Sequence, residues 1–155
     1  MENIKSYKGN LELLNTAKTA FVCSQKVPAD IVLRCYDWAI EMRKAGQCVV
    51  SGFHSPLEKD VLHFLLKGKQ PIIIVLARGM KKQIEPELLV GIAEGRILIV
   101  APFADDVRRV NSTTAQKRNE MMLELADAVT IGYARSESRL QNLLGQYPNL
   151  PKSFL

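Results

Sequence analysis

The fold is decided by residues 48–80, which read CVVSGFHSPLEKDVLHFLLKGKQPIIIVLARGM. The stretch contains two short apolar runs rich in Val and Ile, at residues 48–52 and 71–77, as expected of strands that are buried on both faces. Between them, SPLE at residues 55–58 forms a helix capping box with proline at the first helical position, and the helix ends near Gly68. This order of strand, helix and strand predicts a βαβ unit of a parallel sheet.

The same alternation of apolar runs and helical segments continues on both sides of this unit. Three more Val- and Ile-rich runs predict strands at residues 19–24, 96–101 and 128–134. Helical periodicity predicts four further helices, at residues 28–46, 86–94, 113–126 and 137–144. A capping box between Thr113 and Gln116 is expected at the start of the fourth helix. Together these elements predict an α/β, Rossmann-like fold with a mainly parallel sheet of five or more strands and helices on both faces.

The size and composition of the chain favour one domain over residues 1–155, with an irregular tail over about residues 146–155. The 155 residues are 47% hydrophobic and 6% aromatic, which is enough for one core. The N-terminus lacks an apolar signal segment and no apolar run is long enough to cross a bilayer, so we expect a cytoplasmic protein. Three cysteines are interpreted as core residues, because their odd number and their spacing fit neither a disulfide framework nor a zinc site: Cys23, Cys35 and Cys48.

Basic residues follow the predicted strands. In an open parallel sheet, the loops after the carboxyl ends of the strands lie on one rim, and ligands bind there. The net charge of the chain is +5. The cations expected on that rim, here called the basic rim, are Lys26, Arg78, Lys81, Lys82, Arg108, Arg109, Lys117, Arg118 and Arg135. The alternative is that they are ordinary solvated loop charges. We expect the basic rim to bind an anionic partner.

The best candidate for a phosphate site is the turn between the second predicted strand and its helix. Ser51 and Gly52 end the strand, and the glycine lets a ligand approach the backbone closely. Ser55 opens the helix, whose free N–H groups and positive dipole end point to the rim. Further candidate contacts in the loops after the strands are Ser24, His54 and Gly79. The alternatives are a plain tight turn and a solvated loop histidine.

The sequence offers little for catalysis. It contains neither GxGxxG nor GxxxxGK[ST], which argues against ordinary dinucleotide or Walker-type nucleotide binding, and no cofactor is predicted. The two histidines, His54 and His63, are not spaced as a helical metal pair, and Asp105 and Asp106 lack further ligands, so no metal site is predicted. Glu58 is the one carboxylate placed to act as an acid or base, and the capping box explains it more simply. No catalytic residue is predicted, and binding is favoured over catalysis.

The order of motifs resembles the DprA/Smf (DNA-processing protein A) family, a Rossmann-like group within the SLOG superfamily. The similarity covers about residues 18–144. AFVCSQK at residues 20–26 resembles the opening strand and turn of the family, and residues 48–80 resemble its next strand, helix and strand in order and spacing. In QKRNEMMLELADAVTIGYARSES, at residues 116–138, an Arg-Asn pair falls on that of the family: Arg118 and Asn119.

The resemblance implies a DNA-binding protein that acts in DNA processing or recombination and binds single-stranded DNA along the basic rim. The contacts it implies are Ser51 and Gly52 in the anion-binding turn, with Arg118 and Asn119 at the start of the fourth helix. It also implies a recombinase partner, and it leaves a homodimer open.

A nucleotide-sized ligand stays open as the alternative. The SLOG superfamily also contains sensors of nucleotide ligands and phosphoribohydrolases, although this chain lacks the PGGxGTxxE motif of those enzymes. Proteins that bind single strands usually stack exposed aromatic side chains on the bases. The candidates for stacking are few: Phe53, Phe103 and Tyr133.

Overall fold

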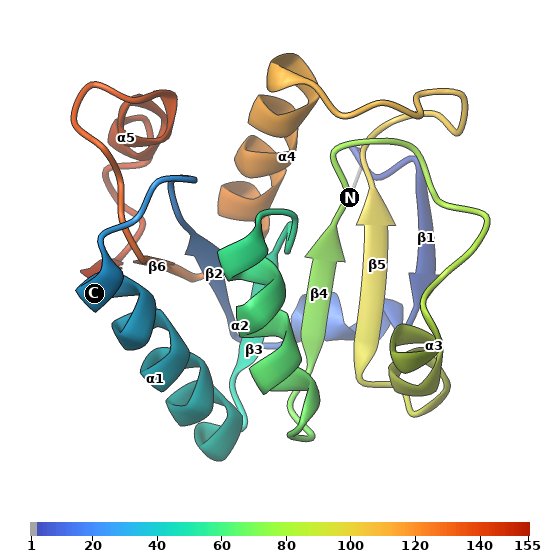
Figure 1. Cartoon of the computed structure of the whole chain (residues 1–155). Helices are drawn as coiled ribbons and strands as arrows, with labels where there is room; N and C mark the ends of the chain where they lie inside the picture. Colours follow the sequence, from blue (N-terminus) through green and yellow to red (C-terminus); the bar gives the residue numbers. More distant parts are fainter. Residues whose placement is uncertain (1–2) are drawn as a thin grey trace.

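The computed structural model describes residues 3–155, and a seven-stranded sheet forms the centre of this part of the chain (Figure 1). The strand order is β1-β5-β4-β3-β2-β6-β7. The strands are β1 (Ser6–Gly9), β2 (Lys18–Val22), β3 (Cys48–Ser51), β4 (Ile72–Val75), β5 (Ile97–Ala101), β6 (Ala128–Ile131) and β7 (Lys152–Phe154). All neighbours pair in parallel except β1, which is antiparallel to β5. The predicted Rossmann-like, mainly parallel sheet is confirmed.

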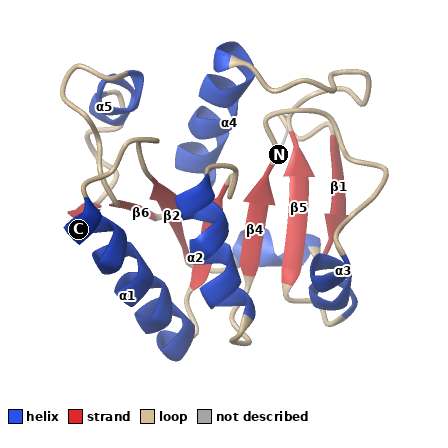
Figure 2. Ribbon diagram, viewed as in Figure 1, coloured by secondary structure: helices blue, strands red, loops and turns tan. Residues whose placement is uncertain are grey.

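Helices cover both faces of the sheet (Figure 2). Within residues 3–155 they are the 3-10 helix η1 (Leu11–Asn15) and the α-helices α1 (Ala29–Ala45), α2 (Pro56–Leu66), α3 (Pro86–Ala93), α4 (Ser112–Leu125) and α5 (Arg139–Gly145). On one face α1, α2 and α3 pack against the strands, and on the other η1, α4 and α5 do so. No helix among these residues is long and apolar enough to span a membrane.

The two cores explain why the strands read as continuous apolar runs. Side chains alternate between the two faces of a strand, and both faces are covered. Val49 and Val50 of β3 thus belong to different cores, and neither is exposed to solvent. The same holds for Ile72 and Ile73 of β4.

Two strands lie outside the five predicted from the sequence. β1 extends the sheet beside β5, and β7 extends it beside β6. The prediction of an irregular tail over about residues 146–155 is therefore wrong at β7, where the backbone pairs with β6 and the amide of Leu155 donates to the carbonyl of Ile131 at 3.0 Å. Both strands are short and mostly polar at the sheet edge, so their backbone pairing leaves little hydrophobic pattern in the sequence.

The start of α4 also differs from the prediction. The capping box joins Asn111 and Thr114, each backbone amide donating to the other side chain at 2.9 Å, instead of Thr113 and Gln116. Asparagine is as good an N-cap as threonine or better. The helix therefore begins at Ser112, at the end of the loop that follows β5.

Candidate functional site

The turn from β3 into α2 is held to the neighbouring strand by Ser51. Its hydroxyl is fully buried, donates to the carbonyl of Phe21 at 3.0 Å and accepts from the amide of Phe53 at 3.4 Å. Phe53 has a φ of +47°, in the left-handed region that non-glycine residues adopt only when the surroundings fix them. Ser51 therefore shapes the turn, and its hydroxyl already has two partners within the chain.

The predicted capping box at the start of α2 is confirmed. The amide of Glu58 donates to the Ser55 hydroxyl at 3.2 Å, and the Glu58 carboxylate accepts from the amides of Ser55 at 2.9 Å and His54 at 3.1 Å. Glu58 is itself buried. The expectation of free amides at this helix start is wrong for these two N–H groups, because a carboxylate of the chain already occupies the place of an anion.

The Arg118 side chain lies directly on Gly52, a residue that the family resemblance assigns to the same site. A Cβ atom at residue 52 would come within 2.7–2.8 Å of Cδ, Nε and Nη1 of Arg118. Any larger residue would displace the guanidinium, so glycine at residue 52 makes room for it. The helix α4 and the β3–α2 turn are thereby brought together at the carboxyl edge of the sheet.

The guanidinium of Arg118 is buried with few partners. The residue is 8% exposed, and its Nε donates to Oδ1 of Asn119 at 3.3 Å. No other hydrogen bond and no ion pair of this guanidinium occurs within the described residues 3–155. Burial lowers the pKa of Arg118, and the nearby charge of Glu58 offsets part of that effect. A buried cation with unused donors is the arrangement expected of an anion site.

Two cavities meet at Arg118. The larger has a volume of about 580 Å³ and lies between α2, α3, β4 and β5, and the smaller has a volume of about 410 Å³ and lies between the ends of β2 and β6 and the start of α4. Arg118 and His54 line both cavities. Partial burial lowers the pKa of His54, and the charge of Arg118 lowers it further. His54 is thus kept neutral to a lower pH than an ordinary histidine.

The basic rim divides between these cavities. Arg78, Lys81 and Arg108 line the larger cavity, and Lys26 and Arg135 line the smaller. Three predicted members line neither: Lys82, Arg109 and Lys117. Lys117 instead lies over the ring of Phe103, with 5.5 Å from its Nζ to the ring centre. With Arg118, six of the nine residues of the basic rim therefore line one or both cavities.

The remaining predicted contacts have mixed surroundings. Ser24 and Asn119 line the smaller cavity, and the Ser24 hydroxyl accepts from the amide of Arg135 at 3.1 Å. Gly79 packs against the loop at residues 104–105, where a Cβ atom would meet the carbonyl of Ala104 at 2.2 Å, and its amide donates to the carbonyl of Val107. Gly79 is needed for loop packing, and its amide has a partner within the chain.

Two cations of the cavities were missed from the sequence. Lys59 of α2 lines the larger cavity and Arg139 of α5 lines the smaller. Both lie in the first turns of helices that start at the carboxyl edge. The basic rim was predicted from the loops after the strands, and these two residues lie beyond those loops. No group of three His, Cys, Asp or Glu side chains that could hold a metal ion occurs in the described part of the chain.

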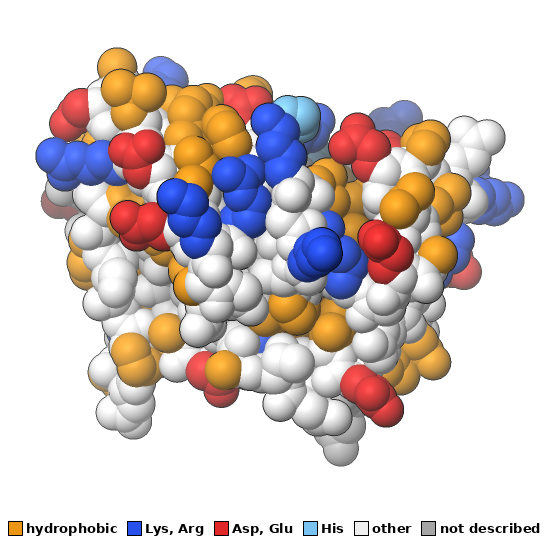
Figure 3. Space-filling model, turned by 90° about the horizontal axis from the view of Figure 1, so that it is seen from below, with side chains coloured by type: hydrophobic (Ala, Val, Ile, Leu, Met, Phe, Trp, Pro, Cys, Tyr) orange, Lys and Arg blue, Asp and Glu red, His pale blue; other side chains and the backbone are white. Residues whose placement is uncertain are grey.

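The opposite, amino edge of the sheet also carries basic side chains. Figure 3 views the molecule from below, toward the amino ends of β4 and β5, and Lys and Arg side chains gather on that face. The segments there contribute Arg43, Lys44, Lys67, Lys69 and Arg96. The number of charges therefore does not by itself distinguish the two edges.

Two cations of the amino edge, the half-buried Arg96 and the buried Lys18, have several partners within the chain. Arg96 donates to four carbonyls that follow or end α2, those of Leu65, Leu66, Gly68 and Gln70, at 2.6–3.2 Å.

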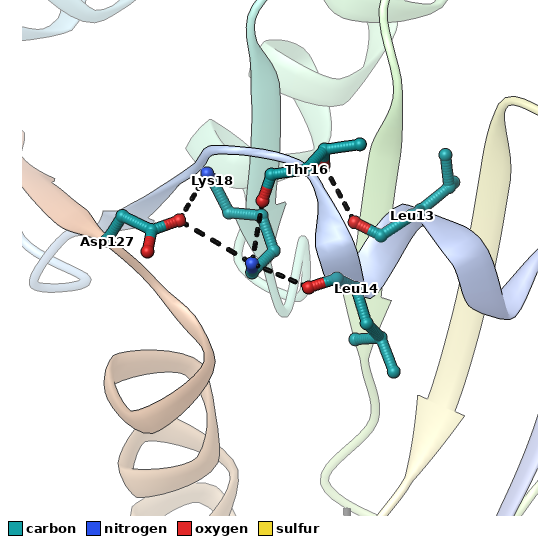
Figure 4. A network of polar contacts seen from close by, with 5 residues as sticks. All are labelled: Leu13, Leu14, Thr16, Lys18 and Asp127. Carbon is teal, nitrogen blue, oxygen red and sulfur yellow. Dashed lines mark hydrogen bonds and ion pairs between the residues drawn. The ribbon is translucent and has the colours of Figure 1, made fainter.

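Lys18 shows the same pattern at the start of β2 (Figure 4). Its Nζ donates to the carbonyls of Leu14 at 2.8 Å and Thr16 at 2.7 Å and lies 3.5 Å from the carboxylate of Asp127. Such bonds tie the fold together and leave no donor for a ligand.

The comparisons with known proteins concern the family and the fold. The family model described as DNA recombination-mediator protein A matches residues 4–139. The search of curated proteins found no match.

Three solved structures share the fold. The chain is similar to DNA processing protein A from Helicobacter pylori, solved in a study of its single-stranded DNA binding mode, with a TM-score of 0.75, 19% identity and coverage of 99% of this chain and 74% of that one. DprA from Streptococcus pneumoniae gives a TM-score of 0.70 and 17% identity, over 94% of this chain and 53% of that one. A Moco carrier protein from Chlamydomonas reinhardtii gives a TM-score of 0.50 and 8% identity, over 90% and 88%.

Proposed function

The chain belongs to the DNA recombination-mediator protein A family, and on that premise we propose that it binds single-stranded DNA at the carboxyl edge of its sheet. The observation that carries the proposal is the buried guanidinium of Arg118, which lies on Gly52 between two cavities with most of its donors unused. A phosphate accepts two parallel hydrogen bonds from a guanidinium, so one phosphate of the strand satisfies this group.

The cations around Arg118 extend the proposed site along the path of a bound DNA strand. Lys26, Arg135 and Arg139 stand on the side of the smaller cavity, and Arg78, Lys81 and Arg108 stand on the side of the larger. A DNA strand that crosses the basic rim would contact cations on both sides of Arg118. Phosphate contacts of this kind bind without regard to sequence and release counterions.

The aromatic side chains support a phosphate-dominated contact. Phe53 is buried in the core, and Phe103 and Tyr133 are half-buried, with Phe103 under Lys117. None of these three presents an open face on which several bases could stack. Affinity in this proposal therefore comes mainly from charge, and we expect it to be modest and steeply salt-dependent.

The test is a fluorescence anisotropy titration with a labelled single-stranded oligonucleotide at roughly 50 and 200 mM salt. We expect Arg118→Ala to weaken binding by about 1.5–3 kcal/mol, the range for hydrogen bonds to a charged group, and Arg118→Lys to recover part of the loss. Lys44→Ala, which removes an exposed cation of the amino edge outside both cavities, is the control and should bind nearly as wild type. Wild-type binding by Arg118→Ala, or binding that is insensitive to salt, contradicts the proposal.

A nucleotide-sized ligand is the second candidate. The observation that favours it is the enclosure of Arg118 by cavities of about 410 and 580 Å³, each within the size range of small-ligand sites. Catalysis has less support, because Glu58 is committed to the amides of His54 and Ser55. Titration with mononucleotides separates the candidates: if Arg118→Ala loses the mononucleotide and keeps the oligonucleotide, the small ligand is the better assignment.

Family membership also carries two proposals about partners. A recombinase partner and a homodimer both follow from the resemblance, and their support is the family alone. Light scattering of the protein with and without oligonucleotide tests the homodimer, and a monomer under both conditions contradicts it.

A further inference from the structure

The larger cavity is a separate feature of the carboxyl edge. α3 is short and begins ten or so residues after β4, so the sheet face over β4 and β5 is only partly covered between α2 and α3 (Figure 1). The cavity of about 580 Å³ lies on that face. Its volume falls within the range of small-molecule sites, roughly 300–1,000 Å³.

The floor and much of the walls of this cavity are apolar, and the polar side chains of α2 that line it are Lys59 and His63. Ile74 of β4 and Ile99 of β5 form part of the floor. Apolar side chains from the surrounding segments complete the lining: Leu62, Leu66, Leu76, Met80, Ile84 and Leu88. A nucleobase placed there would turn the polar edges of its ring toward aliphatic side chains, which is costly when the edges find no partner. The lining therefore fits a ligand with an apolar or aromatic body and few polar groups.

One end of the cavity is cationic. Arg78, Lys81, Arg108 and Arg118 line the rim end, and the carboxylates of the lining, Glu85 and Glu87, belong to the start of α3. Glu85 lies 4.0 Å from Lys81 and offsets part of that charge. Arg118 adds a second observation, because the residue is 8% exposed and its terminal nitrogens have no hydrogen-bond partner in residues 3–155. An anionic group at the rim end would satisfy these donors.

We propose that this cavity is a binding site for a small amphipathic anion, with an apolar or aromatic body on the Ile74–Ile99 floor and a phosphate, sulfonate or carboxylate at Arg118 and Arg108. The site takes a ligand of different chemistry from DNA. Arg118 also lines the smaller cavity, so the ligand and a DNA phosphate compete for one guanidinium. The expected competition rests on the proposed DNA binding, whereas the cavity site does not. By thermodynamic linkage, each of the two ligands lowers the affinity for the other by the same factor.

The probe is 8-anilinonaphthalene-1-sulfonate, an aromatic sulfonate whose fluorescence rises in apolar surroundings. We expect one saturable site in the wild-type protein. Ile84→Asp places a charge on the cavity wall and should weaken binding of the probe by at least about tenfold. Ile92→Asp is the matched control, since Ile92 is also half-buried but lies outside the cavity. Melting curves check that both variants fold.

A second pair of variants tests the cationic end without disturbing the core. Arg108 lines the cavity and Arg109 does not, and both are exposed. We expect Arg108→Ala to weaken binding of the probe about threefold, as for the loss of a solvent-accessible charge contact. Arg109→Ala should leave the affinity for the probe unchanged. Equal binding to all four variants and the wild type overturns the proposal, as does no saturable binding to the wild type.

Competition distinguishes this proposal from the proposed function. A single-stranded oligonucleotide should displace the probe, while Ile84→Asp keeps its affinity for the oligonucleotide. If Ile84→Asp loses the probe and the oligonucleotide alike, the cavity belongs to the DNA site and the proposal is wrong. If AMP displaces the probe better than 1-naphthyl phosphate, the assigned ligand class is wrong. If the probe binds as expected but no oligonucleotide binds, DNA binding fails and the cavity site stands.

Discussion

The amino edge of the sheet holds a half-buried arginine and the carboxyl edge holds a buried one, and the two side chains are used in opposite ways. Arg96, at the amino edge, gives its guanidinium donors to four carbonyls around the end of α2. Arg118, at the carboxyl edge, bonds Asn119 and has no further partner in the part of the chain that the structure describes. The difference separates a cation that stabilises the fold from one that is ready for a ligand.

The physical cost of burial explains this contrast. A buried guanidinium loses water, and partners within the protein must replace the water if the charge is to be tolerated. Arg96 finds them in the orphan carbonyls at the end of a helix, which need donors. Arg118 lies near Glu58 without pairing with it, since Glu58 accepts two backbone amides instead. The charge of Arg118 therefore remains available to an anion.

The largest expected effect is a loss of stability on substitution of Arg96 at the amino edge of the sheet. Arg96→Ala removes the donors of four carbonyls, and we expect the free energy of unfolding to fall by about 3 kcal/mol, because these carbonyls lose hydrogen bonds to a charged group. Oligonucleotide affinity should stay unchanged. Urea denaturation measures the first effect and anisotropy the second. Lys44→Ala, an exposed residue of the same edge, serves as the control. If Arg96→Ala is as stable as the wild-type protein, Arg96 does not stabilise the fold and the contrast between the two edges is wrong.

A smaller effect is expected when the carboxyl edge is crowded. Gly52→Ala places a Cβ atom 2.7–2.8 Å from the Arg118 side chain, which must move. We expect overpacking to cost about 1–3 kcal/mol of stability and the displaced guanidinium to lose much of its contribution to binding. Gly145→Ala is the matched control, because nothing lies within 4 Å of a Cβ atom there. Normal binding by Gly52→Ala means that the position of Arg118 is not critical.

The smallest expected effect is a pH dependence from His54. Its pKa is lowered by partial burial first and then by Arg118, with Lys59 and Lys81 acting in the same direction and Glu58 opposing them. The folded protein therefore binds fewer protons at His54 than the unfolded chain, so this group reduces stability as the pH falls below the ordinary pKa of histidine, about 6.5. A bound phosphate favours the charged form.

Oligonucleotide binding should accordingly strengthen a few-fold as the pH falls through the lowered pKa of His54. Anisotropy titrations between about pH 7.5 and 5.5 measure the change. His54→Gln should lose that part of the pH dependence and keep its affinity at pH 7.5. An identical pH profile for both proteins indicates that His54 does not meet the ligand.

The sequence was sufficient for the main architecture because its signals are local. The capping box at Ser55 and the apolar runs at β3 and β4 fix a parallel unit. β1 and β7 escaped prediction because each is a short edge strand held mainly by backbone pairing. Asn111 was passed over as a cap because Thr113 offered the same chemistry two residues later.

The candidate site could be predicted in part. The family resemblance placed Gly52 and Arg118 in one binding site, and the two residues lie in contact. The sequence could not indicate which polar groups are already engaged. Ser51 bonds Phe21 and Glu58 takes two amides of the helix start, and both bonds depend on three-dimensional neighbours. A list of charges also could not separate Arg118 from Arg96, since their partners decide their roles.

The most direct test of this account is a set of melting curves for wild type, Arg96→Ala and Arg118→Ala, each with and without saturating single-stranded oligonucleotide. A ligand that binds only the folded state raises the melting temperature, and at a fixed ligand concentration the rise grows with the logarithm of the affinity. The account predicts that Arg96→Ala melts well below wild type but keeps the full ligand-induced rise. Arg118→Ala should melt near wild type and lose most of that rise. Equal ligand-induced rises in wild type and Arg118→Ala would contradict the assignment of Arg118 as the ligand-binding cation.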